Sequence, residues 1–117
     1  MHKTAVLYCE ADLKVLSTQA KLFSKAGYAV VPVEGRTAME EAVKAGGFDI
    51  AILGHTLTRD DRHHLPYMVK KSCPEARVVV LHASGKHPAV DVALDSRTGE
   101  EAMLQAVAQA ASELVAT

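Results

Sequence analysis

Histidine and carboxylate side chains give this sequence its most obvious potential for chemistry. The chain has six histidines among 117 residues, and imidazole together with carboxylate is a frequent ligand set for transition metals. Glu10, His55 and His82 each follow an apolar, strand-like segment, so they form a candidate metal site. No H-E-x-x-H or paired C-x-x-C spacing accompanies them. We therefore keep the metal site as an alternative, and we expect DDRHH, residues 60–64, to be a solvated entry to a helix.

Two other chemistries, a cysteine nucleophile and a phosphate-binding loop, find little support. Cys9 lies within an apolar segment, where burial would raise the pKa of its thiol and leave it unreactive. Cys73 precedes Pro74 and has no histidine beside it. The glycines of AGGF, residues 45–48, follow a helical pattern, which is typical of a helix C-cap and not of a nucleotide-binding loop. We therefore expect no enzymatic activity and no cofactor.

Composition and charge limit the partners. The net charge is -1 and the positive charges are spread along the chain, which disfavours nucleic acid. No apolar run approaches the roughly 20 residues of a membrane-spanning helix, and no secretory signal pattern opens the chain. The two cysteines lack C-x-x-C spacing, which agrees with a reduced compartment. We expect a cytoplasmic protein without membrane contact, with residues 1–117 forming a single domain.

Five apolar segments rich in β-branched residues predict five strands. They contain few polar residues, as do parallel strands that are covered on both faces. Pro32 lies inside the second segment, and since proline cannot donate to a strand ladder, we expect this strand at an edge of the sheet. The segments are residues 4–9, 28–33, 48–54, 78–83 and 90–94.

Helical periodicity fills the intervals between the first four strands. Apolar residues recur at helical spacing over residues 13–23. Thr37 and Glu40 have the spacing of a capping box, which predicts that a second helix opens there. Pro66 suits the first turn of a third helix that ends near Ser72.

The last helix has two apolar faces. Thr98 and Glu101 predict its start, again as a capping box. One face is a stripe suited to packing on the sheet, formed by Leu104, Val107, Ala111 and Leu114. The neighbouring face is either a small-residue solvent face or a surface for a protein partner, and it consists of Met103, Ala106 and Ala110.

The alternation of strands and helices predicts an α/β fold, in which helices cover both faces of a parallel sheet. For a chain of this length we expect a flavodoxin-like, three-layer α/β/α sandwich with strand order 2-1-3-4-5. The carboxyl ends of strands one, three and four then share one crevice, where a functional site is expected. Only SGKHPA, residues 84–89, separates the fourth and fifth strands, so we expect the fourth helix to be short or absent.

Three segments of the chain resemble the receiver domain of bacterial response regulators, a CheY-like fold. They are AVLYCEADLKVLSTQAKLFSKAGYAV, TAMEEAVKAGGFDIAIL and CPEARVVVLHASG, which begin at residues 5, 37 and 73. The first is the most specific, because an acidic residue ends the strand and KAGYAV follows one helix later. The resemblance covers almost the whole chain.

The resemblance also implies a phosphorylation pocket that is incomplete. Such receivers hold magnesium with an acidic pair after the first strand and accept phosphate on an aspartate at the end of the third. They place a hydroxyl and a lysine at the ends of the fourth and fifth strands. Here the acidic pair becomes Glu10 and Ala11, the acceptor position is Gly54, the hydroxyl position is His82 and the lysine position is Asp95. Without an aspartate at position 54, no acyl phosphate can form there.

The resemblance therefore implies a degenerate receiver, or pseudo-receiver, of a two-component or phosphorelay pathway. We expect it to bind a histidine kinase or an output protein without accepting phosphate, and a homodimer is left open. The alternative is a small-ligand or metal sensor that uses the same crevice, with Glu10, His55 and His82 as ligands.

Overall fold

The computed structural model describes residues 4–81, 89–94 and 99–115. These residues form five strands and four helices in alternating order, with β4 and β5 adjacent along the chain. The elements are β1 (Ala5–Glu10), α1 (Leu13–Lys25), β2 (Ala29–Glu34), α2 (Gly35–Ala45), β3 (Ile50–Leu53), α3 (Arg59–Ser72), β4 (Arg77–Leu81), β5 (Val92–Leu94) and α4 (Glu100–Val115).

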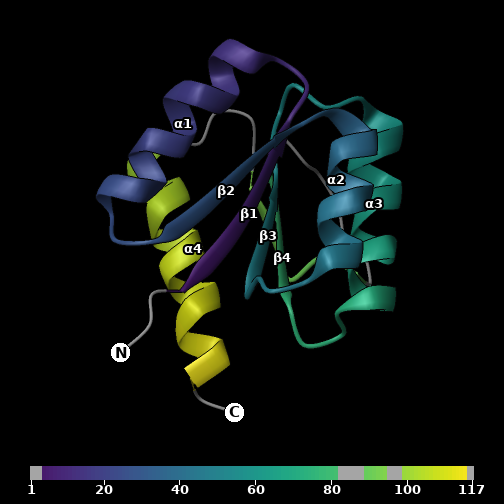
Figure 1. The fold of residues 1–117 in the computed structure, drawn as a ribbon. Helices are drawn as coiled ribbons and strands as arrows, with labels where there is room; N and C mark the ends of the chain where they lie inside the picture. Colours follow the sequence, from purple (N-terminus) through teal and green to yellow (C-terminus); the bar gives the residue numbers. More distant parts are fainter. Residues whose placement is uncertain (1–3, 82–88, 95–98, 116–117) are drawn as a thin grey trace.

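The strands form one parallel sheet in the order β2-β1-β3-β4-β5, which confirms the flavodoxin-like architecture. Helices α1 and α4 cover one face and α2 and α3 cover the other (Figure 1). Strand β5 is shorter than expected. The expectation of a short or missing helix between β4 and β5 concerns residues 82–88, which lie outside the described residues. Within the described parts of the chain, no helix is long and apolar enough to cross a membrane.

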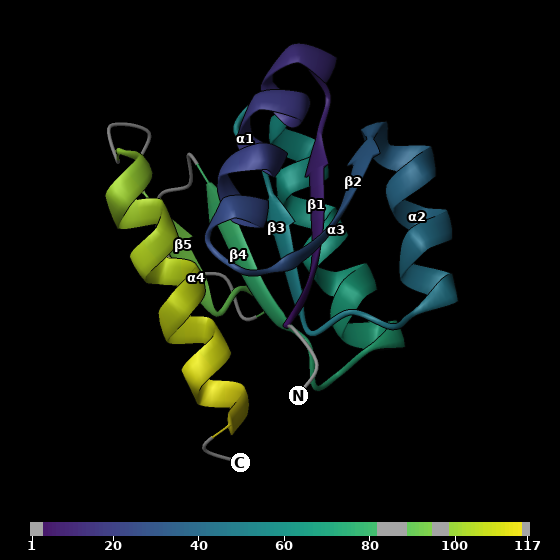
Figure 2. The ribbon, with the colours of Figure 1, turned by 60° about the vertical axis from the view of Figure 1, so that its left-hand side comes forward.

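Each face of the sheet has its own hydrophobic cluster. Side chains alternate between the two faces along a strand, so Tyr8 points to the α1/α4 side while Cys9 points to the α2/α3 side. Tyr8 packs edge-to-face on Phe23 of α1, with 5.3 Å between ring centroids. Figure 2 shows α4 lying along β4 and β5 on this same side.

Strand β2 lies at the edge of the sheet, as its proline predicted. The backbone N–H of Ala29 donates a hydrogen bond over 3.0 Å to the carbonyl of Thr4, the residue directly before β1. Because successive residues of a strand direct their N–H groups to opposite sides, the nitrogen of Pro32 faces away from β1. Proline therefore costs no hydrogen bond of the ladder at this position.

Helix α2 begins before the expected capping box. Gly35 is its first residue and has a φ of 83°, a conformation that glycine adopts at little cost. The chain thereby turns from β2 into α2 without a loop, and Thr37 and Glu40 lie inside the helix. Glu40 accepts a hydrogen bond from Arg36 Nε over 3.0 Å and does not act as a capping residue.

Helix α3 also begins earlier than expected, at Arg59 and not near Pro66. Thr58 is its N-cap, because its hydroxyl accepts a hydrogen bond from the Asp61 N–H over 3.1 Å. Asp60 and Asp61 lie in the first turn, where negative charge favours a helix. The DDRHH segment is therefore part of α3, and Pro66 is buried within the helix.

The face of α4 that we considered for a partner is buried in this structure. Met103 and Ala106 are each 7% exposed and Ala110 is completely buried. Met103 and Ala110 pack in the same cluster as Val107, so α4 contacts the sheet through a wider face than the predicted stripe. Thr98, the expected capping residue, lies outside the described residues.

Candidate functional site

The site lies where β1 and β3 end side by side. Glu10 is the last residue of β1, and Gly54 follows the last residue of β3. The pairing of Cys9 with Leu53 and the 2.9 Å hydrogen bond from the Gly54 N–H to the Cys9 carbonyl place Glu10 next to Gly54. Two of the predicted site residues are thus brought together.

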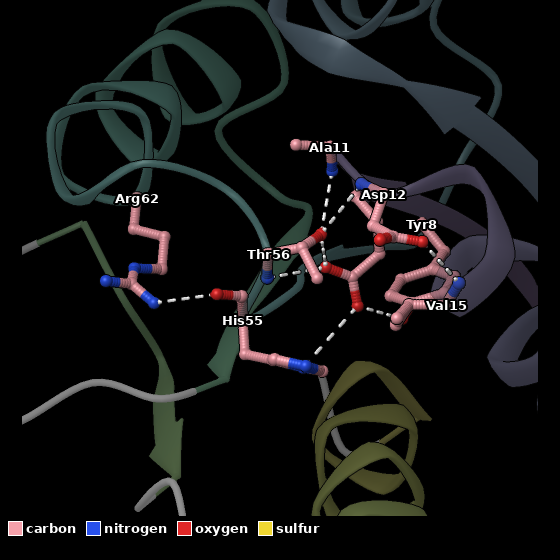
Figure 3. Close-up of polar contacts among 8 residues, drawn as sticks. Tyr8, Ala11, Asp12, Val15, His55, Thr56 and Arg62 are labelled. Carbon is pink, nitrogen blue, oxygen red and sulfur yellow. Dashed lines mark hydrogen bonds and ion pairs between the residues drawn. The ribbon is translucent and has the colours of Figure 1, made fainter.

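The Glu10 side chain is completely buried and fully engaged in hydrogen bonds. Its Oε1 accepts from the Thr56 backbone N–H over 3.0 Å and from the Thr56 hydroxyl over 2.6 Å. Its Oε2 accepts from the hydroxyl of Tyr8, which stands two residues earlier on the same face of β1. Dashed lines in Figure 3 mark these contacts. A buried carboxylate is costly unless donors surround it, and here three donors do so.

The Glu10 carboxylate fills the space into which a side chain at position 54 would project. A Cβ added to Gly54 would lie 1.8 Å from Glu10 Cδ and 2.0 Å from each carboxylate oxygen. Atoms cannot approach so closely. The carboxylate of Glu10 can therefore occupy this inward position only because residue 54 is glycine.

Thr56 connects the loops that follow β1 and β3. While its hydroxyl donates to Glu10, its Oγ1 accepts from the Ala11 N–H over 2.8 Å and from the Asp12 N–H over 3.1 Å. Asp12 is itself the N-cap of α1, with its Oδ1 accepting from the Val15 N–H. Thr56 is not predictable as a site residue from the sequence, because nothing in its local pattern indicates partners about 45 residues away.

His55 lies at the outer side of the site. Its side chain is 51% exposed, and its Nδ1 is 3.9 Å from Glu10 Oε2. Its backbone carbonyl accepts a hydrogen bond from Arg62 of α3 over 3.2 Å. His82, the third ligand of the alternative metal site, lies outside the described residues, as does Asp95. The described residues contain no group of three or more histidine, cysteine, aspartate or glutamate side chains able to hold a metal ion.

Burial keeps the hydroxyl and thiol beside Glu10 protonated. The pKa of Tyr8 is raised well above its usual range, chiefly by burial and further by its hydrogen bond to Glu10. Burial, with the nearby charge of Glu10, raises the pKa of the Cys9 thiol to about 12. Cys9 is therefore not an activated nucleophile, in agreement with the sequence-based expectation.

The sheet order and the helices on both faces define a CheY-like receiver fold. No family model and no curated protein sequence matches the chain. Among solved structures, a response regulator receiver protein from Sinorhizobium medicae WSM419 is 16% identical, with a TM-score of 0.81 and coverage of 97% of this chain and 98% of that one.

Two further structures show the same fold. A CheY-like receiver domain from Methanospirillum hungatei JF-1 is 12% identical, with a TM-score of 0.84 and 97% coverage of both chains. A response regulator from Burkholderia pseudomallei, whose structure has a phosphorylated aspartic acid and a calcium ion, is 21% identical with a TM-score of 0.75. The match covers 97% of this chain and 71% of that one. At such identities the similarity shows the fold alone.

Proposed function

We propose that this chain is a pseudo-receiver, a receiver-like domain of two-component-type signalling that acts through protein contacts and accepts no phosphate. The observation that carries the proposal is the position of the Glu10 carboxylate, which occupies the volume of an acceptor side chain at Gly54. A phosphoacceptor needs a carboxylate that an incoming phosphoryl group can reach. The carboxylate at this point is completely buried and bound by Tyr8 and Thr56.

The proposed partner is a histidine kinase or an output protein, and the proposed compartment is the cytoplasm. Receiver folds pass signals by contact, so the chain needs no catalytic group of its own, and we propose no enzymatic activity. Leu13 supports a contact next to the site, because it opens α1 directly after Glu10, Ala11 and Asp12 and is 61% exposed. With the α4 face buried, Leu13 replaces Met103, Ala106 and Ala110 as the candidate for a partner contact.

Labelling with acetyl phosphate and magnesium, followed by intact mass measurement, tests the proposal. The wild-type chain should keep its unmodified mass. The Gly54→Asp variant should do so as well, because Glu10 obstructs the new carboxylate. A receiver domain that has its acceptor aspartate serves as the positive control. A mass increase of one phosphoryl group on the wild-type chain would refute the proposal.

A further inference from the structure

The loops after β1 and β3 are joined by the chain's own hydrogen bonds. Thr56 belongs to the loop after β3, and its Oγ1 accepts from the Ala11 and Asp12 N–H groups in the loop after β1. The same hydroxyl donates to Glu10, which also accepts from the Thr56 backbone. Four hydrogen bonds therefore connect the loop after β3 with the end of β1 and the loop that follows it (Figure 3).

A magnesium ion of the receiver type does not fit these residues. Mg²⁺ requires a near-octahedral set of oxygen ligands and is reluctant to lose its waters. Of the positions that correspond to the acidic pair, Ala11 has no carboxylate, and both oxygens of Glu10 already accept hydrogen bonds. Position 54 contributes no side chain at all. A cation at this point would have to displace donors that already satisfy a completely buried carboxylate.

We infer that Thr56 and Glu10 together take the place of a cation as the link between the two loops. Thr56 is a positioning residue, which holds the loop after β1 and the start of α1 in a fixed arrangement that needs neither magnesium nor phosphate. The inference deepens the proposed function and rests on it. It assigns the site a single, permanently formed state, in which the surface around Leu13, the proposed partner contact, is always presented.

The amide protons of Ala11 and Asp12 report on this link directly, because the Thr56 hydroxyl oxygen is their acceptor. Hydrogen exchange of these two amides is measured by NMR on the full chain, without magnesium and with excess magnesium. In the wild type both amides should be protected without magnesium and equally protected with it. In Thr56→Val, which keeps the shape and loses the hydroxyl, their exchange should be about tenfold faster, as expected for loss of one hydrogen bond.

Two variants serve as controls. Thr56→Ser restores a hydroxyl and should keep exchange at both amides within about twofold of wild type. Thr58→Val removes a hydroxyl from the same loop, but that hydroxyl caps α3, so exchange at Ala11 and Asp12 should not change. Unaltered exchange in Thr56→Val, or protection of the wild type only when magnesium is present, would overturn the inference. Neither result bears on whether the chain accepts phosphate, so the acetyl phosphate labelling tests the proposed function separately.

Discussion

At the scale of single residues, Glu10 is the most constrained side chain of the site. Moving a carboxylate out of water costs several kcal/mol even after relaxation of the protein. Hydrogen bonds to a charged acceptor contribute about 1.5–3 kcal/mol each, and Glu10 accepts three, from Tyr8 and Thr56. The donors offset a penalty of the same order, so anything that displaces the carboxylate from them should be costly.

A double-mutant cycle between positions 10 and 54 tests this arrangement. Gly54 is not among the glycines with positive φ, so alanine is compatible with its backbone, and any cost of Gly54→Ala comes from collision with the carboxylate. We expect Gly54→Ala to lower the free energy of unfolding by about 2–4 kcal/mol in the wild type. In the Glu10→Ala background the same change should cost less than about 1 kcal/mol, because the obstacle is absent. Urea denaturation of the four proteins gives both values, and equal costs in the two backgrounds would show that Glu10 does not fill this volume.

Tyr8 should make the fold sensitive to alkali. Its pKa is raised in the folded state from an ordinary value of 10.0. The contribution of Tyr8 to the free energy of unfolding is therefore complete below pH 10. Above pH 10 this contribution is lost, because the unfolded chain releases the proton while the folded chain keeps it. The free energy of unfolding should then fall by about 1.4 kcal/mol per pH unit from this group. Tyr8→Phe should be less stable at neutral pH, because it lacks the bond to Glu10, and should show a shallower slope above pH 10. Parallel slopes for the two proteins would contradict the assignment.

At the scale of elements, strand β2 combines apolar side chains with an unpaired edge. Val31 is 52% exposed, and among the described residues β2 pairs with β1 alone. Such an edge invites pairing with another chain. Pro32 has no backbone N–H, so the open edge of β2 lacks a hydrogen-bond donor in its middle. A strand from another molecule could therefore not form a continuous ladder with this edge. The proline thus protects the edge and leaves the pairing with β1 intact.

Replacement of Pro32 should expose this protective role. Pro32→Val restores an outward N–H and should increase self-association, seen as a larger mass by light scattering as the protein concentration rises. Val31→Pro is the matched control, because the Val31 N–H faces β1, and its loss should destabilise the fold by about 3 kcal/mol. If Pro32→Val associates no more than the wild type, the edge is protected by something other than the proline.

At the scale of the whole molecule, the fold was predictable because its signals are local and repeated. The alternation of apolar strands and helical periods, together with the chain length, predicted the sheet order, and Pro32 predicted the edge position of the second strand. Two helix starts were wrong for local reasons: the positive φ of Gly35 replaced the expected cap at Thr37, and the Thr58 cap preceded Pro66. The packed face of α4 depended on tertiary contacts that periodicity does not determine.

The candidate site was only half predictable, for a related reason. The resemblance placed Glu10 and Gly54 in one pocket and indicated that the acceptor aspartate is missing from it, but it did not indicate where the Glu10 carboxylate lies. Whether Glu10 would point outward or fold back over Gly54 depends on donors at Tyr8 and Thr56. The Thr56 donors come from a segment 46 residues away, and no pattern in the sequence encodes that contact.

A molecule whose loops are already linked should respond little to magnesium. A ligand that binds only the folded state stabilises it by RT ln(1 + [L]/Kd), which is about 2.7 kcal/mol at a hundredfold excess over Kd and about 0.4 kcal/mol at equality. For a chain of about 100 residues each kcal/mol shifts Tm by about 4–8 °C. If magnesium binds with a Kd of 10 mM or weaker, as we expect, 10 mM magnesium should therefore raise Tm by less than about 3 °C. Calorimetry in magnesium chloride, compared with sodium chloride of equal ionic strength, separates a rise in Tm caused by magnesium binding from a general salt effect. A magnesium-specific rise of 10 °C or more, abolished in Glu10→Ala, would reveal a true cation site and contradict a link made of hydrogen bonds alone.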